Sequence, residues 1–134
     1  MNATQPPRDS VDKLVGDLLD AASAAADIVA RGRDSWNADR LLRLAGEAVI
    51  GRIGDAASKL PAKVRADMPG IAWDDTRANR ILVAHIYHRI DYAIVWEPLE
   101  RDVPRLAEAV ERWWVRDLER RPAIERQPGF DLGL

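Results

Sequence analysis

Residues 10–32 read SVDKLVGDLLDAASAAADIVARG, and this stretch decides the fold. Its apolar side chains recur at steps of three and four residues, which places them on one face of an α-helix. They are Val11, Leu14, Val15, Leu18, Ala22, Ala25 and Val29. Asp9 or Ser10 can cap the first turn, because their side-chain oxygens accept its free N–H groups. Gly32 can end the helix, because glycine adopts a positive φ without strain.

A second apolar stripe predicts a helix that starts near residues 35–39 and ends near residue 60. Its members are Leu42, Ala45, Val49, Ile53, Ala56 and Leu60. Three glycines lie inside it, at positions 46, 51 and 54, and each costs roughly 1 kcal/mol relative to alanine. Such glycines indicate that another helix approaches closely. Pro61 stops this helix and can open a short one over residues 62–67, before a turn at Pro69-Gly70.

Further helical segments are expected in the second half of the chain. One should run from Asp74 or Asp75 to about Tyr87, and another should start after Asp91. The latter includes Ile94, Val95, Trp96 and Leu99. Pro98 must kink that helix or lie in its first turn, whereas Pro104 fits the first turn of a last helix. The apolar face of that last helix includes Leu106, Val110, Trp113 or Trp114, and Leu118.

The helical pattern predicts an all-α protein, an antiparallel bundle of four to five helices with short connections. Its 134 residues suit one domain spanning 1–134, with irregular tails at 1–9 and 122–134. The absence of cysteine excludes a disulfide framework and thiolate metal sites. No signal peptide or membrane-spanning run is expected, so the sequence predicts a cytoplasmic location without a membrane partner.

The charge balance does not favour broad nucleic-acid binding. The formal net charge is −2, whereas a non-specific binder usually has a basic excess. The basic residues are uneven, with 17 arginines and three lysines. Arginine suits bidentate contact with phosphate, but codon usage in an arginine-rich proteome also explains this bias. The positions of particular arginines must therefore decide the question.

No metal or cofactor is expected. The two histidines, His85 and His88, stand three residues apart, and Asp91 is the one well-placed carboxylate near them. The chain has no glycine-rich phosphate loop and no serine in a nucleophile elbow.

The segment Arg80-Ile-Leu-Val-Ala-His85-Ile-Tyr87 brings a guanidinium, an imidazole and a phenol within eight residues. Imidazole can accept or donate a proton near neutral pH. Guanidinium can neutralise the charge that develops on a pentacoordinate phosphorus. These groups suit cleavage of RNA, which supplies its own nucleophile in the 2′-OH and requires no metal.

The same three residues also fit a purely structural interpretation. Arg80 can reach solvent to form a salt bridge, His85 can be a satisfied histidine at a helix end, and Tyr87 can belong to the core. On an ideal helix Arg80 and Tyr87 share a face, whereas His85 points about 140° away from Arg80. A functional triad therefore needs the helix to end near His85, or a second subunit to complete the site.

The flanking residues add a family resemblance. Arg80-x4-His85-x-Tyr87 resembles the RX4HXY signature of the HepT-like toxins, a branch of the HEPN superfamily. Five further landmarks stand at matching positions. They are Ile53-Gly54-Asp55-Ala56-Ala57, Pro69-Gly70-Ile71-Ala72-Trp73 with Trp73 seven residues before the arginine, Asp91 and Trp96 six and eleven residues after the histidine, and Asp102-Val103-Pro104-Arg105-Leu106. The resemblance covers about residues 53–106.

The sequence departs from this pattern at one motif position. The family usually has a polar residue, often Asn, directly after the arginine, but Ile81 stands here and Asn79 precedes the arginine instead. Asp55 replaces the Glu of the family's I-G-E-A-A stretch, and Pro98 is a further difference.

The resemblance implies a homodimeric, metal-independent endoribonuclease toxin with catalytic residues Arg80, His85 and Tyr87. It also implies a partner, a minimal nucleotidyltransferase (MNT) antitoxin that transfers AMP to the motif tyrosine, Tyr87. The alternative is a non-catalytic helical module that binds such a nucleotidyltransferase, its motif having lost activity through Ile81. A general helical interaction protein is a third possibility, but it leaves the aligned landmarks unexplained.

Overall fold

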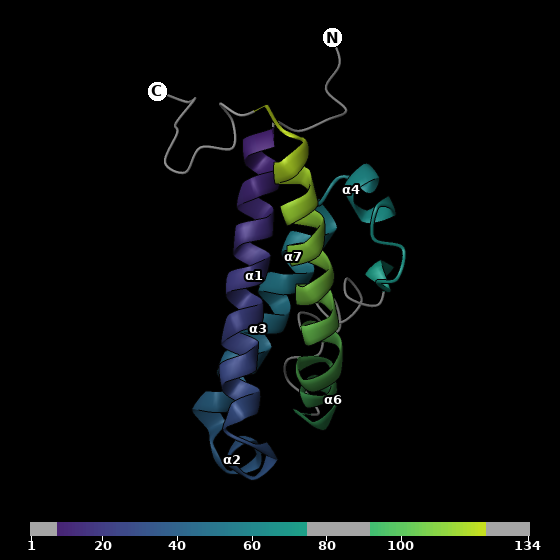
Figure 1. Cartoon of the computed structure of the whole chain (residues 1–134). Coiled ribbons are helices and arrows are strands. Elements are labelled where there is room, and N and C mark those ends of the chain that lie inside the picture. The colour runs from purple at the N-terminus through teal and green to yellow at the C-terminus, as the bar shows by residue number, and fades with distance from the viewer. Residues whose placement is uncertain (1–7, 75–91, 123–134) are drawn as a thin grey trace.

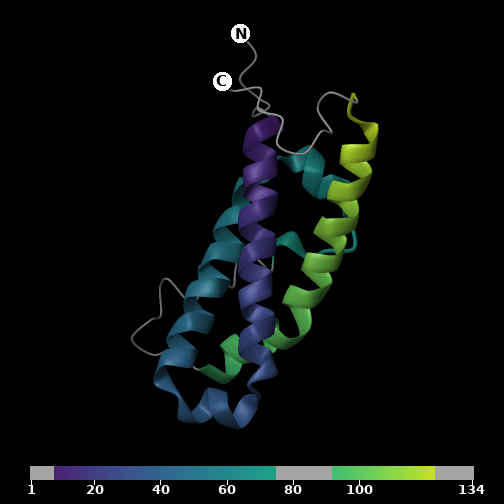
Figure 2. The same cartoon turned by 60° about the vertical axis from the view of Figure 1, so that its left-hand side comes forward.

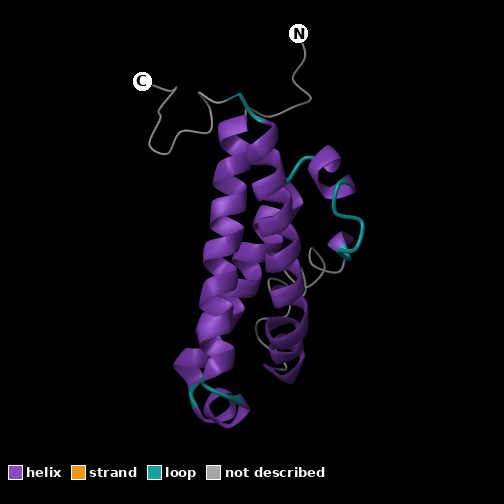
Figure 3. Ribbon diagram, in the orientation of Figure 1, coloured by secondary structure: helices purple, strands orange, loops and turns teal. Residues whose placement is uncertain are grey.

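The described part of the chain is built from helices alone. The computed structural model describes residues 8–74 and 92–122, and no strand occurs in these two ranges (Figure 3). The elements are α1 (Arg8–Ala30), α2 (Arg33–Ala38), α3 (Arg40–Lys59), α4 (Ala62–Ala66), α6 (Tyr92–Glu97), the π-helix η2 (Pro98–Asp102) and α7 (Val103–Arg120). The expected all-α class is confirmed.

Three long helices form the body of the protein. The helix α1 runs antiparallel to both α3 and α7 (Figure 1). It packs against each of them, and Figure 2 shows it between the two. The apolar stripe predicted for residues 10–32 is the inner face of α1, where Val15, Leu18 and Ala25 are fully buried. The helix begins earlier than expected, because Asp9 and Ser10 lie within its first turn and do not precede it.

The predicted second helix is α3, and the separate short helix α2 precedes it. Asp39 separates the two with an extended backbone (φ −112°, ψ 106°), and its carboxylate accepts a hydrogen bond from Leu41 N at 2.9 Å. Asp39 is thus the N-cap of α3, which lies within the start range that the sequence indicated. The short helix α2 before it begins after Gly32, whose φ of +88° uses the freedom expected of that glycine.

The short helix α2 carries one buried side chain, Trp36. This side chain is fully buried, and its ring centroid lies 5.4 Å from that of Trp96 on α6. A Cβ atom built on Gly46 would approach Cη2 and Cζ3 of the Trp36 indole to 2.5 Å. Gly46 therefore forms a notch in α3 that receives the indole, as the helix-interior glycine suggested. A Cβ atom built on Gly51 meets no atom within 4 Å, so the expectation of close approach is wrong at that position.

Gly46→Ala should destabilise the protein by about 1–3 kcal/mol, because the added methyl forces the Trp36 indole out of its place in a packed core. Urea unfolding at a fixed protein concentration measures the change. Gly51→Ala is the matched control in the same helix. It should be neutral or stabilise by up to about 1 kcal/mol, since it adds helix propensity without a clash. Equal effects of the two substitutions would contradict the notch.

The segment α6–η2–α7 is one helical path with a π-helical turn in its middle. Val103 N–H donates to Pro98 O, five residues earlier, and both Pro98 and Leu99 are buried. A proline inside an α-helix removes one backbone bond and crowds the carbonyl four residues before it. Pro98 disturbs the turn that precedes it and is itself the first residue of the wider turn, and the path bends in this region (Figure 2). Pro104 occupies the first turn of α7, as predicted.

A polar network joins the end of α7 to the beginning of α1. Arg121 donates to both oxygens of the Asp12 carboxylate, at 2.6 and 2.9 Å, and to Asp117 at 2.7 Å. Trp114 Nε1 donates to the same Asp12 carboxylate at 3.2 Å. The side chain of Arg121 is only 5% exposed, although arginine is rarely buried unless paired.

The hydrogen bonds to Asp12 raise the pKa of Arg121 above its ordinary value, burial opposes this, and the hydrogen bond to Asp117 adds to it. A raised pKa means that the contribution of Arg121 to stability is complete below the unfolded-state pKa and is lost only at strongly alkaline pH. This guanidinium therefore stays charged throughout the neutral range.

None of the helices described is long and apolar enough to cross a membrane.

Candidate active site

The predicted catalytic residues Arg80, His85 and Tyr87 lie in segment 75–91, outside the described residues. Ile81 and most of the predicted third helix lie there too. The structure describes the beginning of that helix, at Trp73 and Asp74, and it describes the elements that hold the chain on both sides of the segment. The structure therefore shows how the chain is held just before and just after this segment.

Trp73 anchors the chain just before the segment. Its indole is buried, and Nε1 lies 3.2 Å from both Arg65 O and Met68 O. In the stretch between α4 and Trp73, Ile71 N–H donates a hydrogen bond to Met68 O at 3.2 Å. The tryptophan of the P-x-I-x-W landmark thus caps the last turn of α4 and fixes where the following chain begins.

A second indole ties this corner to the bundle. Trp113 of α7 is buried, and its Nε1 donates to Asp67, directly after α4, at 3.0 Å. Its neighbour Trp114 reaches Asp12 on α1 instead. The two adjacent tryptophans therefore make separate contacts within one chain: Trp113 with the residue after α4, and Trp114 with α1. Figure 1 shows α4 beside α7, in agreement with this contact.

Trp96 anchors the chain after the segment. It is buried against Trp36, and its Nε1 donates to Glu100 at 3.3 Å, one helical turn further along. The landmark tryptophans on both sides of segment 75–91 are thus core residues with satisfied N–H groups. Buried tryptophan usually requires such a partner. Both side chains therefore contribute to packing within the described bundle.

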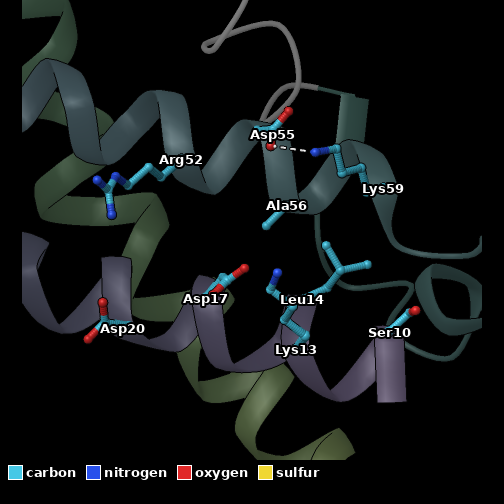
Figure 4. A pocket seen from close by; sticks show the side chains of 9 residues that line it. All are labelled: Ser10, Lys13, Leu14, Asp17, Asp20, Arg52, Asp55, Ala56 and Lys59. Carbon is cyan, nitrogen blue, oxygen red and sulfur yellow. Dashed lines mark hydrogen bonds and ion pairs between the residues drawn. The ribbon is translucent and has the colours of Figure 1, made fainter. Parts of the chain in front are cut away.

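Asp55, the acidic residue of the I-G-D-A-A landmark, lines a pocket of about 470 Å³ between α1 and α3 (Figure 4). It pairs with Lys59 at 3.0 Å on the same helix, while Ala56 and Ala57 beside it are buried. The other charged lining residues are Lys13, Asp17, Asp20 and Arg52.

The charges of this pocket balance, with three cations and three carboxylates around it. Carboxylates on both walls repel a phosphate, so the pocket is poorly suited to the RNA backbone. Within residues 8–74 and 92–122, no three potential ligands of the His, Cys, Asp or Glu type cluster as a metal site. The pocket therefore does not compete with the Arg80–Tyr87 segment for the role of catalytic centre.

The Arg121–Asp12 network and the packing of Trp36 were not predicted from the sequence. Both depend on contacts between residues far apart in the chain, 109 positions in the case of Arg121 and Asp12. A local signal existed only for Asp117 and Arg121, which stand four residues apart on one helix face.

Comparison with known proteins agrees with the motif. The family model described as "Ribonuclease HepT-like" matches residues 18–113. No solved structure gives a significant match. A protein of Methanocaldococcus jannaschii named "Putative RNase MJ1380" is 26% identical over 98 residues, covering 70% of this chain and 90% of that protein.

Two further relatives match shorter stretches. "Putative RNase MJ0125" of the same organism is 31% identical over 67 residues, which are 50% of this chain and 57% of that protein. "Putative RNase TTE0752" of Caldanaerobacter subterraneus is 29% identical over 58 residues, which are 43% of this chain and 52% of that protein. The family match spans well over half of the chain and includes the whole Arg80–Tyr87 motif. The chain therefore belongs to the HepT-like ribonuclease family.

Proposed function

We propose that this protein is a metal-independent endoribonuclease, the toxin of a toxin–antitoxin pair. One observation carries the proposal: the match to the ribonuclease family extends across residues 18–113 and so contains Arg80-x4-His85-x-Tyr87 in full. The anchoring of Trp73 and Trp96 supports it, since both flanks of this motif are held by the folded bundle.

The proposed reaction is transesterification by the 2′-OH of RNA. His85 removes the proton from this hydroxyl, and the 2′-oxygen attacks the adjacent phosphorus. Arg80 stabilises the charge on the phosphoryl oxygens, and Tyr87 orients the phosphate through a hydrogen bond. The bond from phosphorus to the 5′-oxygen breaks, and this oxygen takes a proton from solvent. The products are a 2′,3′-cyclic phosphate and a 5′-OH end.

Incubation of the purified protein with labelled single-stranded RNA tests the proposal. Cleavage should proceed in EDTA and yield fragments ending in a 2′,3′-cyclic phosphate, identified by mass spectrometry. Intact RNA after incubation with the unmodified protein would overturn the proposal. Cleavage that EDTA abolishes would indicate a metal-dependent mechanism.

The active form is proposed to be a homodimer. On an ideal helix Arg80 and His85 point about 140° apart, so two subunits can complete what one helix cannot. The described chain also exposes the apolar side chains Leu41, Leu44, Ile94 and Val115, which a second copy can cover. Light scattering at micromolar concentration should give twice the mass of the chain, and a monomer would contradict the shared site.

The proposed partner is a minimal nucleotidyltransferase antitoxin that acts in the cytoplasm. The Tyr87 oxygen loses its proton and attacks the α-phosphorus of ATP, and pyrophosphate leaves. AMP would add bulk and a phosphate charge beside Arg80, and both would exclude RNA. Intact-mass and peptide mapping after co-expression with a neighbouring nucleotidyltransferase gene should locate the AMP on Tyr87. Modification of Tyr92 instead would contradict this assignment.

Ile81 favours the second candidate function, a non-catalytic module that binds the nucleotidyltransferase. Its apolar side chain stands where the family has a polar one. If a polar group at this position orients Arg80 or the phosphate, Ile81→Asn should raise cleavage by the purified protein. Absence of cleavage in both the wild type and this variant, together with stable binding to the nucleotidyltransferase, would favour the module.

A further inference from the structure

One side of α7 carries a row of exposed arginines. Arg105, Arg112, Arg116 and Arg120 follow at steps of seven, four and four residues, and all four are exposed. At 100° per residue they lie within a sector of about 80°, and each step of four advances about 6 Å along the axis. We call these four residues the α7 arginine row.

The arginine row faces the α4 side of the molecule. Trp113, which contacts Asp67 after α4, lies just beyond one edge of its sector. Glu111 lies about 100° beyond the other edge and lines the groove between α7 and α1. Helix α4 adds two basic residues on its own side, the exposed Lys63 and the half-buried Arg65.

These cations are not engaged in the described fold. Among residues 8–74 and 92–122, no hydrogen bond or ion pair involves the side chain of any member of the arginine row. The Nε atom of Arg65 is buried without a hydrogen-bond partner in the same ranges. By contrast, Arg121 at the end of the same helix is fully committed to Asp12 and Asp117. The row is therefore available for an outside ligand.

We propose that the α7 arginine row, together with Lys63 and Arg65, binds the phosphate backbone of the single-stranded RNA substrate. This proposal rests on the proposed ribonuclease function and extends it to substrate binding. A guanidinium fork matches phosphate geometry, and charges spaced by one or two helical turns along one side of a helix fit a repeating polyanion. Trp73 packs at the corner after α4, so the row lies on the side of the molecule that carries the last described residues before segment 75–91.

The net charge of −2 does not oppose this assignment. Glu108 and Glu119 lie outside the sector, about 40° and 20° beyond its edge on the side of Glu111. Glu111 lies on the α1 side of α7, Glu108 and Glu119 border the sector on its solvent side, and the strip nearest α4 carries the arginines. Local separation of charge creates a basic face on a protein that is acidic overall.

The triple variant R112Q/R116Q/R120Q tests the proposal, because glutamine keeps helix propensity and removes the charge. Fluorescence anisotropy measures binding of a labelled 20-nucleotide single-stranded RNA to the full chain carrying His85→Ala, which prevents cleavage. The triple variant should bind on the order of 100-fold more weakly at 0.1 M salt. The slope of log K against log salt should fall by about 2, since each phosphate contact on a single strand contributes about 0.7.

The matched control is R31Q/R33Q/R40Q, which removes the same charge from exposed arginines around α2 and the start of α3. It should leave affinity and salt slope close to those of the parent. Circular dichroism melts of both variants confirm that each is folded. Equal weakening by the two triples, or an unchanged affinity of the α7 triple, would overturn the proposal. So would binding of the parent to vesicles of anionic phospholipid in preference to RNA.

Failure of this inference is distinguishable from failure of the proposed function. If the wild-type chain cleaves RNA but the α7 triple binds normally, the ribonuclease assignment stands and the arginine row is wrong. If the α7 triple loses binding while the wild type never cleaves, the row is a binding surface without the proposed chemistry. In an active protein, the α7 triple should raise KM and leave kcat nearly unchanged, as expected for contacts remote from the scissile bond.

Discussion

Replacing His85 with alanine should reduce RNA cleavage by about 10²–10⁴-fold, the usual cost of removing a catalytic general base. In the proposed mechanism, the substitution removes the group that accepts the proton of the 2′-OH and leaves the charge of Arg80 unchanged. Initial rates on a labelled single-stranded RNA in EDTA measure the effect. If the protein is the proposed toxin, expression of the His85→Ala chain should no longer arrest growth.

Two companion variants separate chemistry from folding. His88→Ala changes a histidine outside the motif and should cleave at close to the wild-type rate. Arg80→Lys keeps the charge but loses the planar fork of the guanidinium, so this variant should cleave RNA more slowly than the wild type. A His85→Ala protein that cleaves as well as the wild type would exclude this residue as the base.

Asp12→Ala should lower the free energy of unfolding by about 3 kcal/mol, the lower part of the range for breaking a buried ion pair. The substitution leaves Arg121 buried with Asp117 as its remaining charged partner, and it removes the acceptor of Trp114 Nε1. The lower part of the range applies because the Asp12 side chain is 30% exposed. Urea unfolding at a fixed protein concentration, followed by circular dichroism, measures the change.

Lys59→Ala is the control for an exposed pair. It removes the ion pair with Asp55, whose two side chains are 62% and 45% exposed, and it should cost no more than about 0.5 kcal/mol. The double variant D12L/R121M should lose less stability than Asp12→Ala, because apolar groups of similar size replace a buried pair at little cost. If Asp12→Ala costs no more than Lys59→Ala, the network does not hold α7 to α1.

The sequence predicted the helices because their signals are local. The stripe of Val15, Leu18 and Ala25 shows the buried face of α1 directly, and Pro61 and Pro104 mark helix boundaries through their own geometry. The start of α3 after Asp39 falls within the predicted range, but the short helix α2 before it was not predicted, because six residues are too few to show a helical apolar period. The burial of Trp36 depends on its contacts with Trp96 and Gly46, which lie on other helices.

The candidate site depended on a different kind of information. Spacing alone left Arg80, His85 and Tyr87 open to a structural interpretation, and the family landmarks made the functional one specific. The α7 arginine row was present in the sequence as part of the arginine excess. Its meaning required the fold, because only the contact of Trp113 with Asp67 shows which side of α7 faces α4.

The π-helical turn at Pro98–Asp102 affects how relatives should be aligned with this chain. A π turn holds one residue more than an α turn, so a relative lacking one residue here can still continue the helix. Everything before the turn would then be numbered one position differently against α7. Positions counted back from α7 would be misassigned by one, and the neighbour of each proposed site residue would be mutated in its place. An alignment gap for such relatives therefore belongs within residues 98–102, after the landmark Trp96 and before Val103.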